Sequence, residues 1–166
     1  MKNISISTER LELISLAEEH AKVVVGLRND ENVFKYFKRP HRITLEEHVN
    51  WYKARYLNDE TRFDFVIMLK NTGEVIGTCG VSELDTMELS AEVSYMLAPE
   101  YQGYGYAKEA VLGLVEYCFK RFRINKFFAI IHKDNKSSIK FIENLGFHSI
   151  NIEGDFVTYK AEREFG

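Results

Sequence analysis

Hydrophobic and polar positions change their period along the chain, and each change marks an expected element of secondary structure. In the first third, alternation over residues 8–14 predicts a strand. Apolar residues three or four apart then predict two helices, over 16–28 and 45–58. Thr44 and Glu47 form a capping box at the start of the second helix. The N-terminal third is therefore expected to be one strand followed by two helices.

Strand-like segments dominate the rest of the chain. Strands are predicted over residues 63–69, 75–81, 91–98, 126–132, 147–153 and 156–164. Between them, the apolar spacing predicts a long amphipathic helix ending near Phe122 and a shorter helix over 136–145. The expected order, β-α-α-β-β-β-α-β-α-β-β, is that of an α/β protein (an α+β mixed sheet flanked by helices) in a single domain over 1–166. The strand, helix and strand across 91–132 should form a right-handed parallel unit.

Composition and charge exclude several classes of protein. Hydrophobic residues make up 45% and charged residues 28% of the chain, an ordinary globular balance. The net charge of −3 argues against a non-specific nucleic-acid binder, which needs a broad positive surface. The N-terminus lacks a secretory apolar stretch and no run approaches the ~20 apolar residues that span a bilayer, so a cytoplasmic location without membrane contact is expected. The cysteines and histidines are too scattered to predict a metal site.

One short segment is strongly basic despite the negative net charge. It contains Lys35, Lys38, Arg39, His41 and Arg42. Such a segment is ordinarily a solvated loop, and its functional alternative is a contact for an acidic or phosphorylated substrate.

A glycine-rich turn between the strand at 91–98 and the long helix is the most informative segment. It consists of Gln102, Gly103, Tyr104, Gly105, Tyr106 and Ala107. The first amides of a helix lack intrahelical acceptors and its dipole favours negative charge, so the turn is a candidate pyrophosphate site. The Gly-Lys-Ser/Thr of a nucleotide triphosphatase loop is absent, and Lys108 stands where a dinucleotide fingerprint needs a third glycine. The pyrophosphate of CoA is the third ligand to consider, beside a turn that serves packing alone.

A second motif follows one helix and one strand later. It runs N-x-x-S-I-x-F-x-x-x-L-G-F from Asn135 to Phe147. Together with the QGYGYA turn it closely resembles the GNAT superfamily of N-acetyltransferases, and the resemblance covers the chain from Thr8 to Phe147. The resemblance implies a transferase (an acyltransferase) that moves an acetyl group from acetyl-CoA to a primary amine. The amine would attack the thioester directly, without a covalent enzyme intermediate.

The resemblance also assigns cofactor contacts by position. In that family the turn amides wrap the CoA pyrophosphate, which implicates residues 102–107. The preceding strand offers free amides to the pantetheine arm and to the acetyl carbonyl, at Met96 and Leu97. The family's helix-opening asparagine meets the cofactor, which points to Asn135, although a plain helix cap explains that residue equally well. Lys140 lies near enough to aid a phosphate.

Glu92 is the candidate general base. An alkylamine has a pKa of roughly 10 and must lose a proton before it attacks. Many family members carry a glutamate four residues before the position of Met96, and the strand period of two places Glu92, Ser94 and Met96 on one face. The alternative is a carboxylate that orients neighbours or meets solvent. Ile142 occupies the position of the family tyrosine that protonates the leaving thiolate, so no general acid is assigned.

The acceptor amine is left among several classes. Segments 27–29 and 43–48 resemble the acetyltransferases of nucleotide-linked amino sugars, and the basic cluster would suit a nucleotide diphosphate. Segments 8–11 and 98–101 resemble instead the N-terminal acetyltransferases of ribosomal proteins. The sequence favours the amino sugar, while a peptide N-terminus and a small amine such as a polyamine stay open. The missing tyrosine also leaves open a non-catalytic, CoA-binding regulatory module, and the family allows a homodimer.

Overall fold

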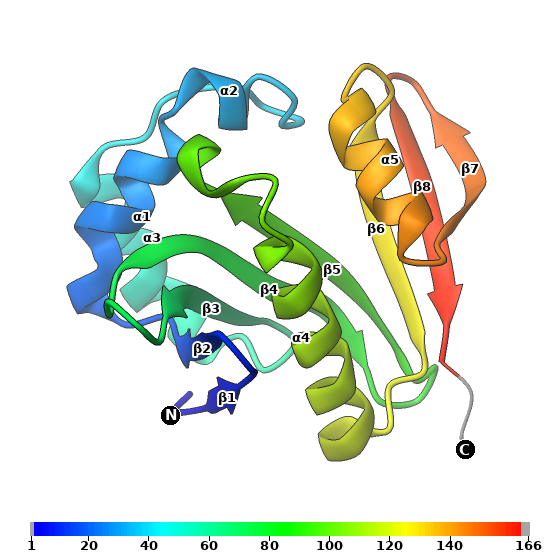
Figure 1. Ribbon diagram of the computed structural model, residues 1–166, viewed down its shortest axis with the longest axis horizontal. Helices are drawn as coiled ribbons and strands as arrows, with labels where there is room; N and C mark the ends of the chain where they lie inside the picture. Colours follow the sequence, from blue (N-terminus) through cyan, green and yellow to red (C-terminus); the bar gives the residue numbers. More distant parts are fainter. Residues whose placement is uncertain (1, 164–166) are drawn as a thin grey trace.

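Within residues 2–163, which the computed structural model describes, the chain forms one eight-stranded sheet with helices on both faces (Figure 1). The strands are β1 (Ser5–Ser7), β2 (Leu11–Ser15), β3 (Phe63–Leu69), β4 (Val75–Asp85), β5 (Ser90–Leu97), β6 (Lys126–His132), β7 (His148–Glu153) and β8 (Phe156–Glu162). They lie in the order β1-β2-β3-β4-β5-β6-β8-β7, and every neighbouring pair is antiparallel except β5 and β6. The predicted mixed sheet and its parallel pair are confirmed.

Helices connect the strands and cover both faces of the sheet. They are α1 (Ala21–Arg28), α2 (Glu31–Phe34), α3 (Leu45–Ala54), α4 (Tyr106–Phe122) and α5 (Lys136–Asn144), with short 3-10 turns η1 (Glu18–His20), η2 (Tyr56–Asn58) and η3 (Pro99–Tyr101). The predicted capping box opens α3, since Thr44 Oγ1 accepts from the Glu47 amide at 3.1 Å and Glu47 Oε1 accepts from the Thr44 amide at 3.4 Å. The long helix α4 ends at Phe122, as its apolar spacing predicts.

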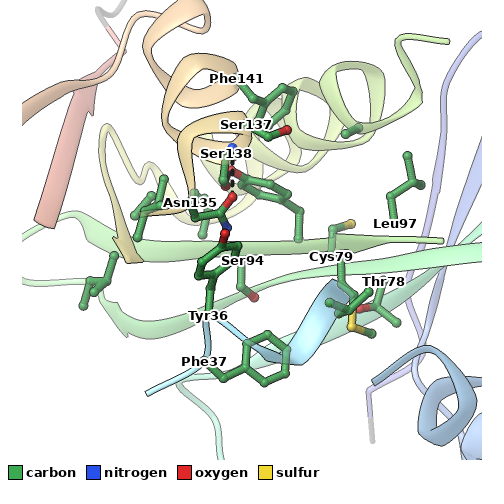
Figure 2. Close-up of a pocket in the computed structure, with 18 of the residues that line it drawn as sticks. Tyr36, Phe37, Thr78, Cys79, Ser94, Leu97, Asn135, Ser137, Ser138 and Phe141 are labelled. Atoms are coloured by element: carbon green, nitrogen blue, oxygen red, sulfur yellow. Dashed lines mark hydrogen bonds between the residues drawn. The ribbon is translucent and has the colours of Figure 1, made fainter. Parts of the chain in front are cut away.

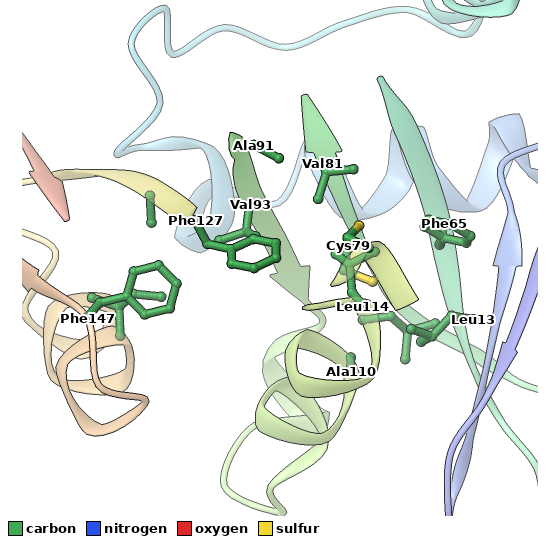
Figure 3. Close-up of a cluster of buried hydrophobic side chains, with 14 of the residues drawn as sticks. Leu13, Phe65, Cys79, Val81, Ala91, Val93, Ala110, Leu114, Phe127 and Phe147 are labelled. Carbon is green, nitrogen blue, oxygen red and sulfur yellow. The ribbon is translucent and has the colours of Figure 1, made fainter. Parts of the chain in front are cut away.

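The two faces of the sheet carry separate hydrophobic cores. The larger core lies beneath α4 and α5 and includes Leu13, Phe65, Cys79, Val93, Leu114 and Phe127 (Figure 3). The smaller core lies beneath α1 and α3 and contains Leu16, Val24, Tyr56 and Val66. Both cysteines are buried free thiols, and burial raises the pKa of the Cys118 thiol to about 12. They are therefore core residues, as their isolation in the sequence suggests.

The central strands β5 and β6 pair only at their beginnings. Their parallel register runs from Ser90 opposite Lys126 to Glu92 opposite Phe128. Beyond that point β5 stays with β4 as far as Leu97, and β6 stays with β8 as far as His132. The two strands diverge in Figure 1, with α4 and α5 on either side of the opening. We call this divergence, from residue 93 of β5 onward, the fork.

The N-terminal third departs most from the predicted boundaries. The strand expected over 8–14 is a hairpin, with β1 added at the edge of β2. The helix expected from residue 16 begins only at Ala21, because the Leu16 amide donates to the Asp64 carbonyl at 2.9 Å and keeps the chain on the sheet. The helix expected over 45–58 stops at Ala54, because the buried Tyr56 hydroxyl accepts from the Asp64 amide at 2.8 Å and turns the chain inward.

Smaller differences fall elsewhere. The short helix α2 is absent from the predicted order, since its length gives too little periodicity to recognise. The strand expected over 75–81 continues to Asp85 in β4. The C-terminal hairpin turns at 154–155 as expected, and residue 164 of the predicted last strand lies outside the described residues.

Candidate active site

A cavity of 1330 Å³ occupies the fork and continues onto the face of the sheet beneath α1 and α3. One end, which we call the turn end, is lined by residues 102–108 except Tyr104 and by the start of α5 over 135–138. The other end, the sheet-face end, is lined by charged and aromatic residues that include Arg28, Tyr36, His48, Arg62, Asp64 and Glu92. Figure 2 shows the labelled side chains Tyr36, Phe37, Ser94, Asn135 and Phe141 around this space. One cavity thus connects two chemically different ends.

The turn end owes its shape to two glycines. Gly103 and Gly105 have φ angles of +89° and +83°, a region in which L side chains are strained. Gly105 caps α4, and its carbonyl accepts from the Glu109 amide at 3.1 Å. The amides of residues 106–108 have no backbone acceptor in the described part of the chain. They lie at the positive end of a 17-residue helix, which is a site for a phosphate group.

Arg10, in the bend between β1 and β2, holds this turn in place through its side chain. Its Nη1 donates to the Tyr104 carbonyl at 3.0 Å, its Nε donates to Glu109 Oε1 at 2.7 Å, and its guanidinium lies 4.5 Å from the centroid of the Tyr106 ring. Thr8 Oγ1 donates to Glu109 Oε2 at 2.5 Å. Partial burial acts to raise the pKa of Glu109, but the hydrogen bonds from Thr8 and Arg10 outweigh it and the pKa lies below its usual range. The segment 8–11 therefore has a structural role that the sequence did not indicate.

The strand before the turn contributes its last residues to the cavity. Met96 and Leu97 both line it, and Gln102 Nε2 donates to the Leu97 carbonyl at 3.3 Å. The Ala98 amide donates to the Ile76 carbonyl of β4 at 2.8 Å. Along an antiparallel ladder, the backbone N–H groups of successive residues point to alternate sides of the strand. Since the Ala98 amide points to β4, the Leu97 amide faces the fork and the Met96 amide again faces β4. Of the two predicted amides, Leu97 is the one presented to the cavity.

The start of α5 forms the opposite wall. Asn135 Oδ1 accepts from the Ser138 amide at 3.2 Å, so Asn135 is a helix cap, and it also lines the cavity. Lys136 lines the cavity as well. Lys140 is exposed and lies outside the cavity wall, and Tyr104 is 62% exposed and also outside it. The predicted cofactor contacts of these two residues stay predictions.

Tyr95 and Ser138 join the two arms of the fork. The Tyr95 hydroxyl lies 2.5 Å from Ser138 Oγ, and the Tyr95 ring packs edge-on against Phe141 with centroids 4.8 Å apart. Burial raises the pKa of Tyr95 to about 12, against the opposing effect of the Ser138 hydrogen bond. Ile142 is 0% exposed and belongs to the larger core. A tyrosine hydroxyl is therefore present at the fork, but it comes from β5 and not from α5.

Glu92 lies at the sheet-face end. Ala91 and Val93 are buried in the larger core, so strand alternation places the Glu92 side chain on the opposite face, with Ser94 and Met96. Its carboxylate forms no hydrogen bond or ion pair with another residue of 2–163. Burial raises the pKa of Glu92, and the positive charge of Lys38 opposes that rise. Glu92 is thus an unpaired carboxylate facing a cavity.

A second carboxylate, Asp64, shares this face but is already engaged. Sheet register aligns Asp64 with Gly80, and Gly80 with Ser94. Asp64 Oδ1 fills the place of the missing side chain, since a Cβ on Gly80 would lie 2.4 Å from it. Arg62 Nε donates to Asp64 Oδ2 at 3.0 Å, and burial raises the pKa of Asp64 despite this pairing. The ion pair joins residues two apart in the chain, whereas the alignment of Asp64 with Gly80 depends on strand register, which periodicity alone does not reveal.

The loop after α2 covers the sheet-face end. The rings of Tyr36 and His132 lie 5.4 Å apart, and Lys38 Nζ lies 5.8 Å from the centroid of Phe156. This loop therefore reaches from the α1 side of the cavity to β6 and β8. Of the basic cluster, Lys35 and Lys38 line the cavity, while Arg42 donates to the Asn29 carbonyl at 3.0 Å.

Two further properties concern the described residues as a whole. None of the helices in this part of the chain combines the length and hydrophobicity needed to cross a bilayer. Within 2–163, no group of three or more His, Cys, Asp or Glu side chains is arranged to hold a metal ion.

Comparison with known proteins adds a family and several relatives. A family profile for the acetyltransferase (GNAT) domain matches residues 10–148. An uncharacterized N-acetyltransferase, p20 of Bacillus licheniformis, is 33% identical over 163 residues, which cover 95% of this chain and 89% of the relative. The spermidine N(1)-acetyltransferase of Escherichia coli (strain K12) is 27% identical over 152 residues, 91% of this chain and 78% of the relative. The crystal structure of spermidine N-acetyltransferase from Vibrio cholerae in complex with CoA and spermine has the same fold, with a TM-score of 0.83 at 22% identity over 93% of this chain and 96% of the other.

Proposed function

The chain belongs to the GNAT family of acetyltransferases, and on this premise we propose that it transfers the acetyl group of acetyl-CoA to the primary amine of a small molecule. One observation carries the proposal: a single cavity joins an amide-lined helix end to the unpaired carboxylate of Glu92 through the fork. Direct attack of an amine on a thioester requires both reactants to be held together, and such a cavity supports this arrangement.

The turn end fits the donor. Free amides at 106–108, with Lys108 and Lys136 in the same wall, suit a pyrophosphate. The edge of β5 in the fork lacks a strand partner, so its backbone groups suit the amides of a pantetheine arm. Acetyl-CoA supplies the acetyl group and a thiolate leaving group. The Leu97 amide, facing the fork, is our candidate donor to the oxygen that gains negative charge during attack.

Glu92 is our candidate for removing the amine proton, directly or through a water molecule. A carboxylate with a raised pKa is a better base at neutral pH than an ordinary one. Glu92 has no competing partner among the described residues, whereas Asp64 is paired with Arg62. The difference in pairing favours Glu92 over Asp64 for this role.

Tyr95 is our candidate for donating a proton to the leaving thiolate. Its raised pKa keeps the hydroxyl protonated at neutral pH, and Ser138 fixes its direction. A thiol with an ordinary pKa of about 8.5 also departs without help, so this assistance should be modest. Ile142, which occupies the position of the family tyrosine, is a core residue and has no hydroxyl group. Tyr95 is therefore our candidate for the proton donor that this tyrosine provides in other family members.

For the acceptor we propose a small primary amine. One of the relatives is named a spermidine acetyltransferase. The loop over 35–38, which contacts β6 and β8, also covers the sheet-face end of the cavity, and this favours a small acceptor. The sugar acceptor that the sequence favours and the peptide acceptor gain no support from the relatives named for spermidine. The cytoplasmic location and the homodimer stay predictions.

A panel of amines tests the proposal. The purified chain, incubated with acetyl-CoA and each amine, should release free CoA thiol in step with the formation of acetylated amine. The panel should contain mono-, di- and polyamines, amino acids, amino sugars and a peptide. If acetyl-CoA binds and no amine in the panel is acetylated, the chain is a CoA-binding regulatory module and the proposal is wrong.

A further inference from the structure

Two polar side chains at the sheet-face end each have a buried nitrogen without a hydrogen-bond partner among the described residues. Arg28 Nε is inaccessible to solvent, and the Arg28 side chain forms no hydrogen bond or ion pair with another residue of 2–163. His48 is 6% exposed, and its Nε2 likewise lacks a hydrogen-bond partner in this part of the chain. Both residues line the cavity. A buried polar group left unsatisfied in a folded protein is rare and calls for an explanation. Because Arg28 is only half-buried, the terminal nitrogens of its guanidinium are the atoms that a ligand in the cavity would contact.

The setting of Arg28 orients it toward the cavity. It is the last residue of α1, and its guanidinium carbon lies 5.3 Å from the centroid of the Phe37 ring in the covering loop. Burial lowers the pKa of Arg28, and the charge of Arg62 lowers it further, while Asp64 opposes them. The pKa of His48 is lowered by burial and by the charge of Arg28, so His48 is neutral beside it at neutral pH. The arrangement therefore presents one unpaired guanidinium.

The charges around Arg28 leave an excess of positive charge. Asp64 is neutralised by its ion pair with Arg62 at 3.0 Å. Lys35 and Lys38 line the same end, and Glu92 is the remaining carboxylate there, while Asp134 at the rim lies 3.9 Å from His132. A polycation would meet this surface unfavourably, because like charges in a half-buried site repel.

We propose that the acceptor amine carries an anionic group, a carboxylate or a phosphate, which Arg28 binds while Glu92 faces the amine. This inference rests on the proposed function and narrows its substrate class. A guanidinium matches the two oxygens of a carboxylate or phosphate with parallel hydrogen bonds. In this arrangement the anionic group of the acceptor binds Arg28, and its amine faces Glu92 in the same cavity.

Matched amines test the proposal. The pairs are β-alanine with propylamine and O-phosphoethanolamine with ethanolamine, with putrescine and spermidine as cationic comparisons. The wild-type chain should show a kcat/KM about tenfold to a hundredfold higher for the anionic member of at least one pair. Arg28→Gln should remove that preference by raising the KM of the anionic amine, and the Kd for acetyl-CoA, which is assigned to the other end of the cavity, should stay unchanged. Lys22→Gln, on the exposed side of α1, is the matched control and should keep the preference.

The outcomes separate this inference from the function on which it rests. Turnover of polyamines or neutral amines without an anionic preference overturns the inference and leaves the acetyltransferase proposal standing. An equal loss for every amine in Arg28→Gln, with a lower melting temperature, assigns Arg28 to folding and also overturns it. If no amine reacts, calorimetry with β-alanine and O-phosphoethanolamine on the CoA-bound protein tests whether Arg28 binds an anionic amine. Binding that Arg28→Gln abolishes supports the inference, and the absence of binding refutes it.

Discussion

The hydroxyl of Tyr95 on β5 lies 2.5 Å from Ser138 Oγ on α5, so one hydrogen bond joins the two arms of the fork. No backbone pairing joins β5 to β6 beyond Glu92 opposite Phe128 in the described chain. The side-chain bond therefore lies where the sheet has opened, and it positions the Tyr95 hydroxyl within the cavity wall.

Tyr95→Phe should lower kcat by about tenfold, because it removes the proposed proton donor for the thiolate. This decrease in kcat is smaller than the loss of a general acid usually causes, since a thiolate leaves readily without protonation. Steady-state kinetics with saturating amine measure it, and Tyr104→Phe, outside the cavity wall, is the control. An unchanged kcat in Tyr95→Phe would show that the thiolate departs unassisted.

Glu92→Gln should lower kcat/KM by about a hundredfold or more, since it removes the proposed base. The base acts in its ionised form, so the wild-type rate should rise as the pH passes upward through the raised pKa of Glu92. That rise should be absent in Glu92→Gln. Glu88→Gln, an exposed carboxylate before β5, should behave as wild type. If Asp64→Asn abolishes the pH dependence while Glu92→Gln retains it, Asp64 is the base.

The same substitution should stabilise the fold. The folded-state pKa of Glu92 lies above its unfolded value, so the folded chain binds more protons than the unfolded chain in the interval between them. Stability contributed at this site therefore falls as the pH rises from the ordinary glutamate pKa upward. Glu92→Gln removes this loss of stability. In urea unfolding, the free energy of unfolding of the variant should exceed that of the wild type at pH 8, and the difference should disappear at pH 4. A destabilised variant at pH 8 would mean that the carboxylate has a favourable partner.

Arg10→Met should weaken acetyl-CoA binding by about tenfold, because the turn loses its hydrogen bond at the Tyr104 carbonyl and its contact with the Tyr106 ring. Titration calorimetry measures the Kd, and kcat at saturating acetyl-CoA should change little. The neighbouring Glu9→Gln should leave the Kd unchanged. Equal affinity in wild type and Arg10→Met would show that the turn holds its shape without these contacts.

Two glycine substitutions form a matched pair. Gly105→Ala should cost about 1–2 kcal/mol because its φ is +83°, and it should weaken acetyl-CoA binding by displacing the helix-end amides. Gly26→Ala lies within α1 with nothing within 4 Å of the added methyl group, so it should stabilise the chain by about 0.5–1 kcal/mol without affecting binding. Opposite shifts in melting temperature are the expected result. Two stabilising shifts would contradict the assigned strain at Gly105.

The parts of the site that the sequence could predict are those determined by local geometry. Gly103 and Gly105 mark a turn whose positive φ angles only glycine adopts without strain, and the apolar spacing of α4 locates the helix end beside it. Strand alternation likewise placed Glu92 on the face away from Val93. Each of these inferences needs only residues that are close together in the chain.

The remaining site residues come together through tertiary structure. Arg28 ends a helix, Asp64 lies on β3, and Arg10 reaches α4 from the bend before β2, so neither period nor spacing relates them. Strand register decides that Gly80 makes room for Asp64, and register is set by packing across the sheet. Helix boundaries near Leu16 and Tyr56 moved for the same reason, because both residues bond to Asp64 of β3.

The most direct test uses a second donor, acetyl-pantetheine, which lacks the pyrophosphate of acetyl-CoA together with its phosphoadenosine. Calorimetry should show that acetyl-CoA binds at least about a hundredfold more tightly than acetyl-pantetheine, because only acetyl-CoA offers phosphates to the amides at 106–108. Equal affinities, or no heat with either donor, would contradict the assignment of the glycine turn to the donor and with it the catalytic arrangement.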